Sequence, residues 1–228
     1  MNRLLLVEDV FLLGHDDDSG RNTASLGLPG ALAGALLLDL AEQDVVRVEA
    51  DDVHPTGNEP SHPLLRRAAA ALREQEKTRS VSWWLARLPR ELKPLDRSIG
   101  ESLVERGILG EEQGKVLGIF SSTRWPELDP APERALRAEL RDALLGTADP
   151  STRVLLLIGL LHHQGMVDGL VDKPDRKRAR RRAGELVKIA ESSDAISEAI
   201  GDSARAATMT AITTATMAAT TAAMVSSN

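Results

Sequence analysis

Apolar residues recur along most of the chain at the spacing typical of helices. Pro29 stands where a helix favours its first residue, and apolar residues continue at helical spacing to about Gln43. The run at 154–161 is apolar on every side, which predicts a buried, central helix. Residues 4–13 fit either a helix or a buried strand, because so short a run does not separate the two. We expect further helices at about 61–77, 83–92, 95–106, 133–145 and 176–191.

A β-hairpin is predicted around residues 110–114, where two short apolar runs flank the sequence EEQG. Its tip would carry Glu111 and Glu112, and the strand at 115–120 would be short and edge-like. A second short strand is expected at 45–49, followed by a loop at 51–60. Because strands do not alternate with helices, the pattern predicts an all-α bundle with one hairpin.

The composition suits a helix-packed protein and narrows its chemistry. Aromatic residues make up 2% of the chain, so the core must consist mainly of Leu, Val, Ala and Ile. The chain has no Cys, which excludes disulfides and Cys-ligated metals. Its formal net charge is −6, so any attraction to lipid or nucleic acid must come from a local patch.

The first residues do not resemble a secretion signal. Glu8 and Asp9 interrupt the apolar run, and no small-residue cleavage site follows it. We therefore expect a cytoplasmic protein, either free or bound peripherally to the inner face of the membrane.

Three positions suggest the receiver domain of a phosphorelay. Glu8 and Asp9 follow an apolar run, Asp51 or Asp52 could accept a phosphoryl group, and Lys93 could contact it. A receiver, however, needs five buried parallel strands that are nearly continuous in Val, Ile and Leu. The residues before Asp51 are half polar and those before Lys93 are helical, so the scaffold argues against a receiver.

No catalytic or metal-binding motif is recognisable. The segment Asp16, Asp17 and Asp18 misses the spacing of a calcium loop, whose twelfth position would be Glu. His162 and His163 are adjacent and point to different faces of a helix, whereas a two-His metal face needs positions i and i+4. We expect a non-enzymatic protein with no cofactor and no metal.

The densest run of cations is RKRARRR, with six cations in seven residues that surround most of a helix. Such a run either forms a solvated surface helix or attracts the protein to an anionic membrane. In the second case each cation near the membrane contributes about 1 kcal/mol to binding. Nucleic acid is a less favoured partner, because no aromatic residues are interleaved with the cations. The candidate membrane patch comprises Arg176, Lys177, Arg178, Arg180, Arg181 and Arg182.

Two further features bear on membranes. Trp83 and Trp84 could anchor at the headgroup zone, although we expect at least one of them to pack in the core. The segment 206–225 has no charge but is rich in Ala and Thr, which makes it only weakly hydrophobic. A closing helix with a frayed end is therefore expected there rather than a membrane anchor.

Several stretches, taken in order, resemble the Golgi phosphoprotein 3 family. They are LLLVEDVFLLGHDDDSGR, LAGALLLDLAEQDVVRVE, ESLVERGILGEEQGKVLGIFSSTRWP and DPSTRVLLLIGLLHHQGMVD, followed by the basic helix. The match in order and spacing covers about residues 4–212. It implies one domain at 1–212, a helical bundle ringed by amphipathic helices with a protruding β-hairpin, and an Ala/Thr-rich tail at 213–228.

The resemblance also implies a function. Members are peripheral membrane adaptors that bind phosphatidylinositol 4-phosphate and hold glycosyltransferases at the Golgi. The Trp and the three Arg of their headgroup pocket correspond here to Ala24, Ala33, Lys93 and Asp96. Only Lys93 keeps a positive charge, so a looser preference for anionic phospholipid or phosphoinositide is expected, because a phosphate pocket needs several converging cations.

The expected headgroup contacts are Lys93 and, from their proximity to it, Arg97 and Arg90. Membrane-protein tails are a further expected partner. The alternative is a soluble protein–protein interaction module that oligomerises through the hairpin at 107–120 and binds no lipid. In that case the basic helix would meet an acidic partner protein.

Overall fold

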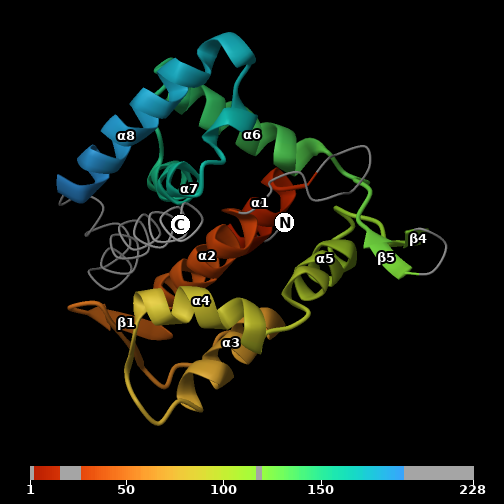
Figure 1. Ribbon diagram of the computed structural model, residues 1–228, viewed down its shortest axis with the longest axis vertical. Helices are drawn as coiled ribbons and strands as arrows, with labels where there is room; N and C mark the ends of the chain where they lie inside the picture. The colour runs from red at the N-terminus through yellow and green to blue at the C-terminus, as the bar shows by residue number, and fades with distance from the viewer. Residues whose placement is uncertain (1–2, 16–26, 117–119, 193–228) are drawn as a thin grey trace, which may run out of the picture.

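The computed structural model describes residues 3–15, 27–116 and 120–192, and over these ranges the protein is mainly α-helical (Figure 1). The α-helices are α1 (Leu6–Leu13), α2 (Leu28–Glu42), α3 (Pro63–Arg73), α4 (Val81–Glu91), α5 (Leu95–Glu105), α6 (Ala131–Leu145), α7 (Thr152–His163) and α8 (Arg176–Ser192). Two 3₁₀ segments, η2 (Val167–Leu170) and η3 (Lys173–Asp175), precede α8. The predicted fold class, a helical bundle with a hairpin, is confirmed.

Helices α1 and α2 cross the middle of the bundle (Figure 1). Helix α2 packs against α1, α3, α4 and α7, which buries most of its Leu and Ala side chains on every side. Gly34 brings α2 close to α7, because a Cβ there would lie 2.7 Å from Cδ2 of Leu160. The expected burial of 154–161 is found for all of these residues except Leu155, which is partly buried.

The ambiguous run at the start of the chain forms a helix, α1. All of its residues are buried, including Glu8 and Asp9. A strand would need neighbouring strands for its backbone groups, whereas a helix satisfies most of them internally and leaves only its ends to be capped.

A three-stranded antiparallel sheet lies beside the lower end of the bundle in Figure 1, in the order β1–β2–β3. It comprises β1 (Val46–Glu49), β2 (Asp52–Pro55) and β3 (Arg79–Ser80). The strand expected at 45–49 is therefore present, but part of the expected loop at 51–60 is strand β2. Only Val53 of β2 is buried, so its sequence shows almost no apolar alternation.

The hairpin exists but lies further along the chain than predicted. Its strands are β4 (Glu112–Val116) and β5 (Phe120–Arg124), with Val116 paired to Phe120. Glu112 therefore begins a strand and is not at the tip. The apolar run before it is not one of the two hairpin strands: Leu109 forms only an isolated antiparallel bridge with Glu127, and Ile108 and Leu109 are buried directly after α5.

Helices α6, α7 and α8 pack together at the upper end of the molecule in Figure 1, away from α3 and α4. Helix α8 buries a stripe of mostly small residues, namely Ala179, Ala183, Leu186, Val187 and Ala190. The predicted domain boundary at 212/213 and the Ala/Thr-rich tail lie outside the described residues.

Candidate lipid-binding surfaces

The acidic residues near the start of the chain are part of the core and do not form a binding surface. Asp39 of α2, 2% exposed, accepts hydrogen bonds from the backbone N–H groups of Leu6 (2.8 Å) and Val7 (2.9 Å). It thereby caps the N-terminus of α1 from a neighbouring helix. Burial raises the pKa of Asp39 to about 8, although the two N–H donors lower it.

Asp9 forms a buried ion pair with Arg153 of α7. Oδ2 of Asp9 accepts from Nη2 and Nε of Arg153 at 2.6 and 3.0 Å, and the same Nη2 donates to the carbonyl of Leu4 at 2.7 Å. Burial is the main cause that raises the pKa of Asp9 to about 6, and Arg153 opposes it. This pair ties α1 to α7.

Glu8 ties α1 to α5 in the same way. Its fully buried carboxylate accepts from the Leu5 N–H at 2.9 Å, from Oγ of Ser102 at 2.7 Å and from Nη1 of Arg106 at 2.9 Å. Nε2 of His62, at the start of α3, lies 3.1 Å from Oγ of Ser102. The three acidic residues thus hold α1 in place against α2, α5 and α7.

Ser102, His62 and Glu8 are the residue types of a catalytic triad, but their hydrogen bonds run in the wrong order. Nδ1 of His62 accepts from the Leu64 N–H (3.3 Å), so the proton of the neutral imidazole is on Nε2, which donates to Ser102. Ser102 in turn donates to Glu8. In a triad the imidazole accepts the serine proton, so this arrangement does not activate Ser102.

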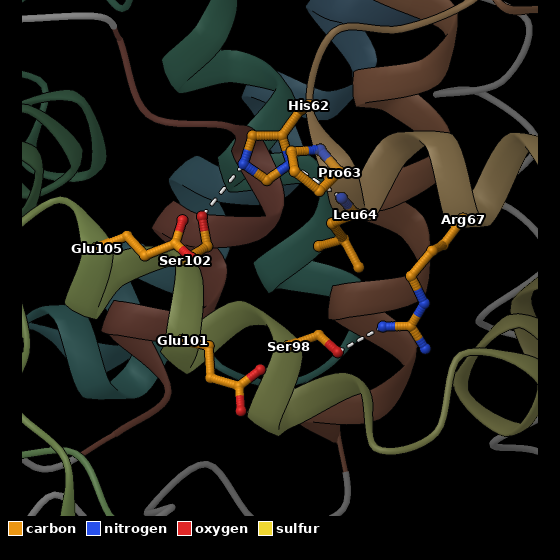
Figure 2. A pocket seen from close by; sticks show the side chains of 8 residues that line it. All are labelled: His62, Pro63, Leu64, Arg67, Ser98, Glu101, Ser102 and Glu105. Carbon is orange, nitrogen blue, oxygen red and sulfur yellow. Dashed lines mark hydrogen bonds between the residues drawn. The ribbon is translucent and has the colours of Figure 1, made fainter.

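A cavity of about 170 Å³ opens beside this network, between α3 and α5 (Figure 2). Arg67 is the cation of its wall, and it already donates to Oγ of Ser98 (2.6 Å) and to the carbonyl of Leu92 (3.2 Å). Glu101 and Glu105 also line the wall. Two carboxylates and a bound guanidinium do not favour a phosphate ligand. The lining residues are His62, Pro63, Leu64, Arg67, Ser98, Glu101, Ser102 and Glu105.

The three predicted headgroup contacts lie around the connection between α4 and α5, and all three are exposed. Arg97 is already paired, since its Nε donates to Oε1 of Glu101 (2.7 Å) and its Nη2 lies 3.9 Å from Glu111. The hydrogen bond to Glu101 raises the pKa of Arg97. Within the described part of the chain, Arg90 and Lys93 form no ion pair, so their charges are available to a ligand.

The other positions aligned with the headgroup pocket of the family do not supply a cation. Ala33 is fully buried inside α2, and Asp96 is exposed in the first turn of α5. Ala24 lies outside the described residues. Lys93 is therefore the one cation among the aligned positions that the structure describes.

Two exposed cations of the basic run in α8 are already bonded to neighbouring residues. Arg180 forms a two-point ion pair with Asp168 at 2.7 and 3.0 Å, and Arg178 donates to the carbonyl of Leu145 at the end of α6. Ala179 between them is fully buried. The cations thus do not surround the helix, as the sequence had suggested, because one face of α8 packs against α6 and α7.

The remaining cations of this run differ in their surroundings. Arg181 and Arg182 lie 3.8 and 3.4 Å from Glu185, whereas Lys177 is exposed and has no ion pair with a described residue. Arg176 is only partly exposed. Lys177 and Arg181, one turn apart, are the cations that most clearly face the solvent.

The two adjacent tryptophans have different surroundings. Trp84 is 2% exposed and belongs to the core, as expected for one of the pair. Trp83 is partly exposed, and the guanidinium carbons of Arg79 and Arg87 lie 5.0 and 5.7 Å from its ring centroid. Arg79 and Arg87 were not among the residues predicted from the sequence to contact lipid.

Comparison with known families accounts for this architecture. The family model described as Golgi phosphoprotein 3 (GPP34) matches residues 6–214. The chain belongs to this family. The resemblance expected from the ordered stretches is thereby confirmed. The Golgi phosphoprotein 3 family is not known as enzymatic, and a search of curated proteins finds no match to the chain.

The described ranges show neither a membrane-spanning helix nor a cluster of metal-binding side chains. None of the helices there is both long enough and apolar enough to cross a bilayer. The same ranges contain no group of three or more His, Cys, Asp or Glu side chains placed to hold a metal ion.

Proposed function

We propose that the chain is a peripheral membrane protein that binds anionic phospholipid headgroups. The observation that carries this proposal is a pair of exposed cations, Arg90 and Lys93, without an acidic partner in the described structure of a chain whose net charge is −6. Membership of the Golgi phosphoprotein 3 family supports it, because Lys93 aligns with a cation of the headgroup pocket that the family resemblance implies.

A loose headgroup preference follows from the charges at this place. Arg90 and Lys93 can approach a phosphate, whereas Arg97 would first have to leave Glu101. Exposed cations acting separately contribute little each and do not distinguish one phosphate from another well. We therefore propose binding to anionic phospholipids in general, phosphoinositides such as phosphatidylinositol 4-phosphate included.

The basic run of α8 would add a general attraction. Arg176, Lys177, Arg178, Arg180, Arg181 and Arg182 lie at the other end of the molecule from α3 and α4 (Figure 1). Arg178 and Arg180 already have partners, so Lys177 and Arg181 are the main source of this attraction. It acts over about 8 Å at physiological salt, which makes it sensitive to ionic strength.

Co-sedimentation with liposomes tests the proposal. Neutral vesicles, vesicles with phosphatidylserine and vesicles with phosphatidylinositol 4-phosphate would be compared at low and physiological salt. We expect similar binding to both acidic kinds, weaker binding at higher salt and none to neutral vesicles. Binding that is equal on neutral and acidic vesicles, or absent from all, would contradict the proposal.

A second candidate function rests on the β4–β5 hairpin. The two strands pair only with each other in the described structure, so each has an open edge that could pair with another copy. The protein would then be a soluble interaction module that oligomerises without lipid. Replacing residues 112–124 by a short Gly/Ser linker should reduce its mass in sedimentation equilibrium, whereas an unchanged mass argues against this function.

A further inference from the structure

One side of α4 combines a tryptophan with cations. Trp83, Arg87 and Arg90 are spaced i, i+4 and i+7, which places them on one face of the helix. The opposite side, with Trp84 and Leu88, is buried. Arg79 of β3 lies over Trp83, and Lys93 follows Leu92, the residue that caps the end of α4. We call this set, Arg79, Trp83, Arg87, Arg90 and Lys93, the α4 face.

We propose that the α4 face is the surface that docks on an anionic bilayer, with Trp83 at the level of the headgroups. This inference rests on the proposed function and assigns it to particular residues. It adds Arg79, Trp83 and Arg87 to the expected headgroup contacts and makes α4, rather than α8, the element that touches lipid.

Trp83 has the surroundings of an interfacial anchor. Its ring packs at right angles against the buried ring of Trp84, with centroids 4.9 Å apart, so its position is fixed by the core. It stays partly exposed on the outer side of the helix. Tryptophan favours the membrane interface because its ring is apolar while its N–H can reach the headgroups.

The two guanidinium groups beside the ring suit the same location. Those of Arg79 and Arg87 lie 5.0 and 5.7 Å from the centroid, within the range of cation–π attraction. Nε of Arg79 is shielded from solvent and has no hydrogen-bond partner in the described structure. Both cations are therefore held at the depth of the ring, where lipid phosphates would lie.

The charge of the α4 face matches an anionic bilayer. It presents four cations, whereas α4 itself contributes one carboxylate, Glu91, which pairs with Arg87. Nucleic acid fits the face less well, because Trp84 and the two guanidinium groups already contact the ring on which a base would stack. Binding to a bilayer needs no stacking on the ring, and the ion pair between Arg87 and Glu91 can remain in place.

Quenching of tryptophan fluorescence by brominated lipid tests where Trp83 lies. The other two tryptophans, Trp84 and Trp125, are 2% and 6% exposed, so neither should meet lipid. Vesicles of brominated phosphatidylcholine and phosphatidylserine should quench the wild type. The variant Trp83→Phe, which keeps an aromatic ring against Trp84, should show almost no quenching at a protein and lipid concentration at which it is still bound.

A second test compares the loss of two cations from the α4 face with the loss of two cations elsewhere on the surface. Arg90→Gln/Lys93→Gln removes two unpaired cations of the α4 face and should weaken binding to phosphatidylserine vesicles about 25-fold, at roughly 5-fold per cation. Arg134→Gln/Arg141→Gln makes the same charge change on exposed residues of α6, at the other end of the molecule, and also breaks the exposed ion pair between Arg141 and Asp172. Because those cations would lie beyond the screening length, we expect less than about a threefold change.

The outcomes separate this inference from the proposed function. Binding to acidic vesicles without quenching of Trp83, or with equal losses in the two double variants, would overturn the α4 face while the proposed function stands. No binding of the wild type to any vesicle would remove both. A gel shift with DNA that is lost in Arg90→Gln/Lys93→Gln, without vesicle binding, would assign the face to nucleic acid and overturn the inference too.

Discussion

The acidic side chains around α1 and the basic side chains of α8 have opposite surroundings. Glu8, Asp9 and Asp39 are almost completely buried, and each one has specific donors on another element. The basic run of α8 lies at the surface, where Arg180 and Arg181 form exposed ion pairs and Lys177 forms none with the described residues.

The two groups differ in how much they contribute to the stability of the fold. A buried charge that loses its partner is left without water or a counter-charge, so its bonds fix the arrangement of helices. An exposed ion pair is worth about 0–1 kcal/mol, because water and salt replace it easily. The cluster around α1 therefore stabilises the fold, whereas the exposed ion pairs of α8 and α4 contribute little to it.

Removing Arg153 should have the largest effect on stability. Arg153→Met leaves Asp9 buried without its cation and the carbonyl of Leu4 without its donor. We expect a loss of about 3–5 kcal/mol in the free energy of unfolding, measured by urea denaturation.

Arg180→Met is the matched control, because it breaks an ion pair whose side chains are 61% and 35% exposed. It should cost less than about 1 kcal/mol. Equal losses in the two variants would contradict the division between buried and exposed charges.

The pH dependence of stability should show the buried carboxyl of Asp39. Burial raises its folded-state pKa to about 8 from 3.8, so between these values the folded protein holds a proton that the unfolded chain has released. Stability therefore falls as pH rises through this window, by at most about 1.4 kcal/mol per unit. The pKa of His62 is lowered in the folded protein, so His62 makes stability rise with pH. This effect is confined to pH values below its unfolded pKa of 6.5.

The clear window is therefore pH 6.5 to 8, and urea denaturation at several pH values in this range would measure the slope. Asp39→Asn cannot titrate and should flatten the slope. A wild-type stability that stays level or rises over this range would show that Asp39 is ionised in the folded protein.

His62 gives an intermediate case, since it is partly exposed but bonded into the cluster. His62→Ala removes the side-chain acceptor for the Leu64 N–H at the start of α3 and the contact with Ser102. A lost N-cap costs about 1 kcal/mol, which thermal or urea unfolding can resolve. His62→Asn offers a cap again and should recover most of the loss; if it does not, the contact with Ser102 matters more than the cap.

Much of the fold could be predicted from the sequence, because the helices bury regular apolar faces. Helix α5 ends where Gly107 takes a positive φ of 72°, as its glycine and apolar spacing indicate. The hairpin was misplaced because the buried Ile108 and Leu109 look like one of its strands, whereas Leu109 forms only an isolated bridge with Glu127 outside the two paired strands. Strand β2 was missed because only Val53 in it is buried.

The candidate surfaces were harder to predict, because side-chain partners come from distant parts of the chain. Arg153 lies 144 residues from Asp9, and no local pattern connects them. Asp39, in the middle of an apolar helix, was the one visible signal that a buried cap was needed. The spacing of Trp83, Arg87 and Arg90 was also present in the sequence, but it acquires meaning only once Trp84 is known to face the core.

The smallest effect on stability is expected on the outer side of α8. Lys177→Gln/Arg181→Gln removes an unpaired cation and one that lies 3.8 Å from Glu185, so the free energy of unfolding should change by less than about 0.5 kcal/mol. If α8 adds only a general attraction, this variant should bind acidic vesicles more weakly at low salt but nearly as well as the wild type at physiological salt. A loss of stability above about 1 kcal/mol would mean that these exposed charges hold the fold as the buried ones do. An equal loss of binding at both salt concentrations would instead mean that they contact lipid directly.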